Sequence, residues 1–152
     1  MNFSARRFLL AGMLVTVALL SGACAGASKV MPKERALALQ QSAETYRKLV
    51  RWGDFAAASQ YCRPRRGEPA SFDPARYKHW KVSSYEVADA QLGQDHAEAS
   101  FSAALAFYST ETGRAGVLRD VQRWWYDKAT KRWYLESPLP DFAAAAGQAI
   151  SR

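Results

Sequence analysis

The chain has 152 residues and a formal net charge of +7, with 49% hydrophobic and 23% charged residues. This length suits one compact domain and is too short for two ordinary ones. The excess of Lys and Arg over Asp and Glu would favour binding to anionic lipids or glycans as well as to nucleic acid. The sequence contains neither a Gly-rich phosphate loop nor a nucleophile elbow. These two motifs therefore give no indication of nucleotide binding or of hydrolysis by a serine nucleophile.

Residues 1–23 have the features of a secretory signal peptide. Arg6 and Arg7 precede an uncharged apolar run over residues 8–20, and small residues follow. As a helix this run would span about 20 Å, less than the ~30 Å hydrocarbon core of a membrane, so a permanent transmembrane helix is the weaker interpretation. We therefore expect the mature protein to face the periplasm, where nucleic acid is the least available of the anionic partners, and we predict no nucleic-acid binding.

The end of the leader predicts a lipid anchor. Residues 20–24, LSGAC, resemble the bacterial lipobox, in which a cysteine behind small residues becomes the lipid-carrying first residue of the mature protein. The resemblance implies that Cys24 is lipidated, and the residue after it, which is not aspartate, implies the outer membrane. Cleavage by ordinary signal peptidase, without lipidation, is the alternative. Residues 24–32 would then form a short tether.

The remaining cysteine and the histidines predict no metal site and no cofactor. If Cys24 carries lipid, Cys62 has no partner within the chain, and a lone periplasmic thiol is usually buried and inert. His79 and His96 stand alone on different segments, which is not the spacing of metal ligands.

Residues 32–62 predict two helices. Pro32 suits a helix start, and Gly53 can end this helix while Asp54 caps a short second one over residues 55–62. In the first helix apolar residues recur at spacings of three and four, so one stripe faces a core. The members of this stripe are Leu39, Ala43, Tyr46, Leu49 and Val50.

Residues 63–80 carry three prolines and no apolar period, so we expect a connecting loop. It gathers five cations against only two acids. The cations are Arg63, Arg65, Arg66, Arg76 and Lys78. A solvated loop is the simpler interpretation, and a patch for phosphate or lipid headgroups is the functional one.

From residue 81 the apolar period becomes two, which predicts antiparallel strands. We expect strands over residues 82–92 and 96–108 and two long strands within residues 117–137. The second strand would present one face with Ala97, Ala99, Phe101, Ala103, Leu105 and Phe107. Residues 140–152 are expected to form a frayed helical tail.

The stretch 121–137, VQRWWYDKATKRWYLES, predicts a hairpin with aromatic rings on both faces. With a two- or four-residue loop centred on Ala129 and Thr130, Asp127 opposes Arg132, and alternation assigns each ring to a face. The uncharged face, which must be core, holds Trp124, Tyr126, Trp133 and Leu135. Trp125 and Tyr134 share the charged face, where we expect the long helix to cover them. A platform for a ligand ring or sugar is the alternative.

The order of the elements, with YRKLVRWGDF at residues 46–55 and the aromatic hairpin, resembles the nuclear transport factor two-like domain, a cystatin-like cone, over residues 33–139. The resemblance implies an α+β fold in which N-terminal helices pack on a curved antiparallel sheet. It also implies a cone whose mouth is often a ligand pocket and whose outer face often makes a dimer. The enzymes of this group use a carboxylate beside a tyrosine or histidine. Tyr46 and Asp120 are the candidates, although Asp120 is more simply a partner of Arg119 or Arg123.

The leading hypothesis is therefore a non-enzymatic, membrane-tethered periplasmic module that binds an envelope protein, a second copy of itself or a small hydrophobic or anionic ligand. Tyr46, Trp125 and Tyr134 are the candidate ligand-binding residues. The alternatives are a small cone-pocket enzyme of the isomerase or hydratase type, and an envelope assembly or secretion accessory whose basic loop meets lipid or another subunit.

Overall fold

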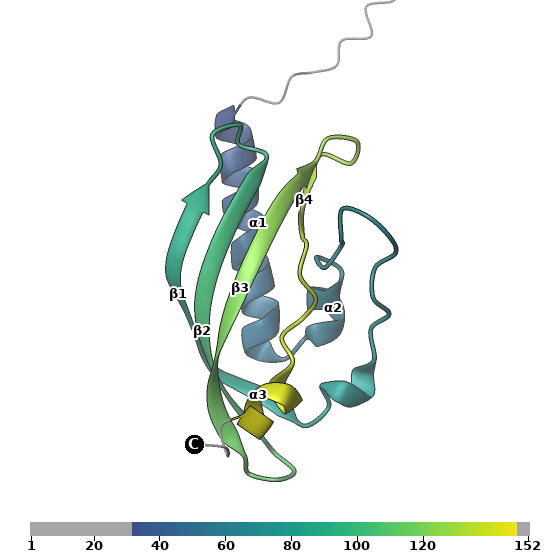
Figure 1. The fold of residues 1–152 in the computed structure, drawn as a ribbon, viewed down its shortest axis with the longest axis vertical. Helices are drawn as coiled ribbons and strands as arrows, with labels where there is room; N and C mark the ends of the chain where they lie inside the picture. The colour runs from purple at the N-terminus through teal and green to yellow at the C-terminus, as the bar shows by residue number, and fades with distance from the viewer. Residues whose placement is uncertain (1–31, 149–152) are drawn as a thin grey trace, which may run out of the picture.

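The computed structural model describes residues 32–148 and confirms the predicted α+β class. Its helices pack on a curved sheet of four antiparallel strands in the order β1-β2-β3-β4 (Figure 1). The predicted signal peptide and the lipidation residue Cys24 lie outside the described residues, as does nearly all of the tether. Within the described part, no helix is both long and apolar enough to cross a membrane.

α1 begins and ends, and α2 begins, at the signals that the sequence predicts. α1 spans Pro32–Trp52 and ends at Gly53, whose φ of +81° is the left-handed conformation that favours glycine. The side chain of Asp54 accepts a hydrogen bond from the amide of Ala57 and caps α2, Phe55–Ser59. α2 is shorter than the predicted 55–62, because the backbone beyond it bonds to the last strand instead.

The four strands are β1 (Trp80–Leu92), β2 (Glu98–Ser109), β3 (Ala115–Asp127) and β4 (Arg132–Leu135). The inward side of β2 is the predicted one, since Ala99, Ala103, Leu105 and Phe107 are buried. β1 shows two register shifts against β2, between Val82 and Ser84 and between Val87 and Asp89. Such bulges bend a strand and increase its twist, and here they lie in a sheet that curves over α1.

The aromatic hairpin has the predicted register. Trp124 pairs with Leu135, Trp125 with Tyr134, Tyr126 with Trp133, and Asp127 with Arg132. The uncharged face is buried against α1, where the indole of Trp133 donates to the carbonyl of Arg35 at 2.9 Å. β4 has only four residues, whereas the sequence predicted a second long strand. The chain leaves the sheet just before Pro138 and Pro140, which lack the N–H that a continuing strand would need.

The C-terminal segment packs on the domain instead of fraying from it, as far as the structure describes it. Helix α3, Phe142–Gln148, lies at the end of the sheet opposite the aromatic hairpin (Figure 1). Leu139, Phe142 and Ala146 are all buried in the core. The Phe142 ring lies 5.3–6.3 Å from four other rings, which belong to Phe55, Tyr77, Trp80 and Phe107.

Candidate functional site

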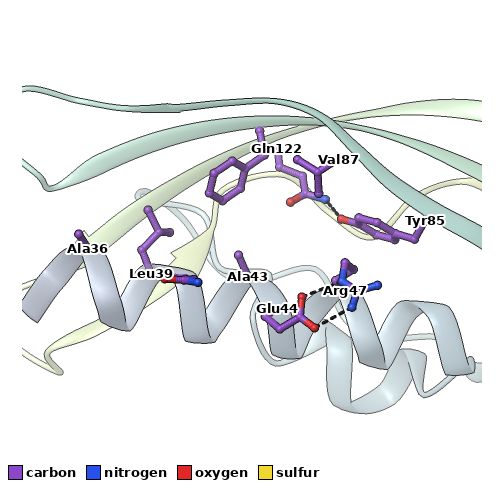
Figure 2. A pocket seen from close by; sticks show the side chains of 10 residues that line it. Ala36, Leu39, Ala43, Glu44, Arg47, Tyr85, Val87 and Gln122 are labelled. Atoms are coloured by element: carbon purple, nitrogen blue, oxygen red, sulfur yellow. Dashed lines mark hydrogen bonds and ion pairs between the residues drawn. The ribbon is translucent and has the colours of Figure 1, made fainter.

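A groove between α1 and the sheet, which we call the α1–sheet groove, is a candidate site with a predominantly apolar lining (Figure 2). It has a volume of about 350 Å³. Two alanines, Ala36 and Ala43, lie on the side of α1 that faces the sheet, and their small side chains leave the space open. The other apolar walls come from Leu39 on α1 and from Val87 and Phe101 on the sheet.

A buried amide forms the polar wall of the α1–sheet groove. Gln122 is 2% exposed and lies on the inner face of β3. Its Nε2 donates to Oδ2 of Asp120 at 2.6 Å and to the hydroxyl oxygen of Tyr85, and its Oε1 accepts from the indole of Trp124 at 3.1 Å. Burial is the main cause that raises the pKa of Tyr85, so its hydroxyl keeps its proton at neutral pH.

An ion pair marks the rim of the groove on α1. Nε and Nη2 of Arg47 donate to the two carboxylate oxygens of Glu44 at 2.7 and 2.6 Å, and the Lys48 ammonium lies 3.6 Å from the same carboxylate. The hydrogen bond from Arg47 is the main cause that holds the pKa of Glu44 below its ordinary value. Both acceptor oxygens of Glu44 are therefore engaged within the helix.

Asp120 is buried without a cationic partner among the described residues. Its carboxylate accepts from Gln122, and the arginine beside it, Arg119, donates instead to Ser102 at 3.0 Å. The interpretation of Asp120 as a partner of Arg119 or Arg123 is wrong, because strand alternation puts both arginines on the outer face. Burial raises the pKa of Asp120 above its ordinary value, more than the hydrogen bond from Gln122 lowers it.

Replacing Asp120 with asparagine should stabilise the protein at neutral pH. Because the folded-state pKa is raised, the unfolded state releases this proton more readily, and the wild type loses stability as the pH rises through the ordinary aspartate range. Asparagine carries no charge and still offers an oxygen to Gln122. In urea unfolding, Asp120→Asn should be more stable than the wild type at about pH 7, with the difference shrinking towards about pH 3. Asp89→Asn, at an exposed position on β1, is the control; an equal gain there would contradict this explanation.

The structure places Tyr46 in the centre of the core and not along the groove. It is 0% exposed, and its ring makes edge contacts with Trp124 and Tyr61 at 5.7 and 6.2 Å. Among the described residues, its hydroxyl has no hydrogen-bond partner. Burial and the nearby charge of Asp120 raise the pKa of Tyr46 well above its ordinary value. The two residues of the predicted carboxylate–tyrosine pair thus lie near each other, but no hydrogen bond joins them.

Replacing Tyr46 with phenylalanine should raise the free energy of unfolding by about 1 kcal/mol, because the change removes a buried hydroxyl that has no partner and keeps the ring. Chemical denaturation followed by circular dichroism would measure the gain. Tyr108→Phe, on the exposed side of β2, should be close to neutral. A clear loss of stability in Tyr46→Phe would show that the hydroxyl makes a bond in solution.

Trp125 and Tyr134 lie together on the outer face, with ring centroids 5.6 Å apart. The expectation that the long helix covers them is wrong, because α1 packs on the opposite face. The loop after α2 partly covers them instead: the carbonyl of Arg63 accepts from the Trp125 indole at 2.8 Å, and the Arg63 guanidinium lies 5.1 Å from the Tyr134 ring centroid.

Three of the five basic-loop cations are held by carboxylates of other elements. Arg63 lies 3.7 Å from Asp127, Arg76 pairs with Asp141 at 2.7 Å, and Arg65 pairs with Glu98 at 2.5 Å and with Glu136 at 3.8 Å. For Arg66 and Lys78 no partner is present among residues 32–148. The loop therefore offers a smaller free positive charge than its sequence indicates.

Cys62 is half-buried, and burial raises the pKa of its thiol to about 12. The thiolate needed for reactivity is thus disfavoured. In the region that the structure covers, no group of three or more His, Cys, Asp or Glu side chains is placed to hold a metal ion.

No family model, curated protein or solved structure matches this chain. The groove residues Tyr85, Gln122, Glu44 and Arg47 were not singled out from the sequence. The sequence did contain one indication for Gln122. It lies two residues before Trp124 and four before Tyr126 on the same strand, so its polar side chain has to share their inward face and lie among the core rings.

Proposed function

We propose that the protein is a membrane-tethered periplasmic binding module that takes a small, largely apolar ligand into the α1–sheet groove. The observation that carries this proposal is the groove itself. Its volume of about 350 Å³ lies within the usual range for ligand pockets, and its apolar walls surround a few polar groups, the pattern of sites that orient a small molecule. The lipobox-like cysteine and the leader support the location in the cell envelope, on the outer membrane.

A non-enzymatic role fits the chemistry of the groove better than the isomerase or hydratase alternative. Neither Tyr46 nor Asp120 lines it, and the carboxylate that does, Glu44, is held by Arg47. The order of elements that resembles the nuclear transport factor two-like domain is compatible with a binding role and with an enzymatic one, so the support for binding comes from the groove and not from the fold class.

The binding proposal is tested by titrating the full chain with N-phenyl-1-naphthylamine, an uncharged apolar fluorophore whose emission rises in an apolar site. Ala43→Leu places a larger side chain in the groove and should weaken binding at least about tenfold. Gln41→Leu adds a leucine to an exposed position of α1 and should leave the affinity unchanged. No binding by the wild type, or equal binding by all three proteins, would refute the proposal.

The envelope location is tested by the intact mass of the protein recovered from bacterial membranes. A diacyl- or triacyl-modified chain that begins at Cys24, and is absent in Cys24→Ala, is the expected result. An unmodified chain beginning in the same region would instead indicate a protein free in the periplasm.

A further inference from the structure

We propose that the α1–sheet groove selects ligands whose polar group is an oxygen acceptor of the carbonyl or carboxylate kind, and that the hydroxyl of Tyr85 is the donor that recognises it. This inference rests on the proposed ligand-binding function and adds the class of ligand. It follows from the direction of the hydrogen bonds that hold Gln122, which together fix what Tyr85 can offer.

Trp124 determines which way the side-chain amide of Gln122 is oriented. An indole N–H can only donate, and here it lies 3.1 Å from the side-chain oxygen of Gln122. Turning the amide over would set its NH₂ group against the indole N–H, and two donors would then face each other in a buried place. Trp124 therefore holds Oε1 on its own side and directs Nε2 to the other, independently of pH.

Both hydrogens of Nε2 are then used. One is donated to Oδ2 of Asp120 at 2.6 Å and the other to the oxygen of Tyr85. An amide nitrogen has no lone pair to offer, so the Tyr85 oxygen is the acceptor in that bond, and its own O–H hydrogen remains to be donated. No described residue accepts it. Because Tyr85 lines the groove and its hydroxyl is directed into it beside Gln122 (Figure 2), the unused donor is available to a ligand.

The acceptor oxygens of Gln122 and Glu44, in contrast, each accept a hydrogen bond already. Gln122 Oε1 is bonded to Trp124, and Arg47 binds both oxygens of Glu44. Gln40, the remaining polar residue of the lining, is exposed and can turn either end of its amide to a ligand, so it adds no preference. A donor group of a ligand would have to share an oxygen that already accepts a hydrogen bond, whereas an acceptor gains the unused hydrogen of the Tyr85 hydroxyl.

The test uses three nine-carbon probes that differ in their polar group: nonanoate, 2-nonanone and nonylamine. Each competes with N-phenyl-1-naphthylamine on the full chain. We expect the two acceptors to displace the fluorophore at concentrations about tenfold lower than nonylamine. An advantage of nonanoate over 2-nonanone would assign the site to a carboxylate, with the Arg47 side of the rim contributing its charge. Equal displacement by nonanoate and 2-nonanone would show that the site recognises the oxygen acceptor without a contribution from charge.

Tyr85→Phe removes the hydroxyl donor and keeps the ring, so it should lower the preference for 2-nonanone over nonylamine, with both probes measured against the affinity of that variant for the fluorophore. Tyr108→Phe removes a hydroxyl from the outward side of β2 and should preserve the preference. An undiminished preference in Tyr85→Phe, or nonylamine binding as well as the acceptors in the wild type, would overturn the inference and leave the groove a binding site. Failure of the fluorophore itself to bind would overturn the proposed function as well.

Discussion

Replacing Trp124 with alanine should lower the free energy of unfolding by about 3–5 kcal/mol, the range for a large aromatic side chain removed from a core. Trp124 is 0% exposed, and three rings surround it at centroid distances of 5.7–6.4 Å: Tyr46, Tyr61 and Phe101. The substitution opens a large cavity. It also leaves the buried oxygen of Gln122 without its donor. Urea unfolding followed by circular dichroism measures the loss without depending on tryptophan emission.

The neighbouring tryptophan provides the control. Trp125 lies on the outer face of the same strand, partly exposed, where it contacts Tyr134 and donates one hydrogen bond to the loop. Trp125→Ala should cost only about 1 kcal/mol. Similar losses for the two adjacent substitutions would contradict the assignment of these rings to opposite faces.

This division between Trp124 and Trp125 was predictable from the sequence, because it depends on local information. In a strand, alternate residues point to opposite faces, and Arg123, Asp127, Arg132 and Glu136 of the hairpin all share one face. Cross-strand pairing of Asp127 with Arg132 then fixes the register through the turn. The α+β class follows in the same way from the change of apolar period along the chain, which needs no knowledge of distant contacts.

What covers the outer rings was not predictable, because it depends on contacts between distant parts of the chain. The amide of Leu135 donates to the carbonyl of Tyr61 at 2.7 Å, and the amide of Arg63 donates to the carbonyl of Leu135 at 2.8 Å. These bonds draw the segment after α2 alongside β4 and end α2 early. They also bring Arg63 over Tyr134. No apolar period in residues 60–66 signals this path.

The groove residue Tyr85 was missed for a related reason. Strict alternation from Val82 would place Tyr85 on the other face, but the register shift between Val82 and Ser84 adds a residue and turns Tyr85 inward. One extra residue in a strand is hard to recognise from the alternation of apolar and polar residues alone. Gln122 did obey the alternation, and its inward position in a row of aromatic residues was the strongest available indication of a polar site.

The prolines after β4 end the strand, but they do not end the packed part of the chain. Pro138 and Pro140 end β4 and predict a tail, yet the next apolar residue, Phe142, is 1% exposed and packs among rings from α2, the basic loop and two strands. Phe142→Ala should therefore lower the free energy of unfolding by about 3–5 kcal/mol in urea.

An exposed position on the same helix separates the loss of this packing from a general effect on α3. Ala144→Ser should change the free energy of unfolding by no more than about 0.5 kcal/mol. If Phe142→Ala were equally mild, α3 would not be part of the core in solution. The expected large difference would mean that the lower end of the sheet is closed by a helix that follows the last strand, so a chain ending at residue 139 would leave Phe55, Trp80 and Phe107 without the ring that packs against them.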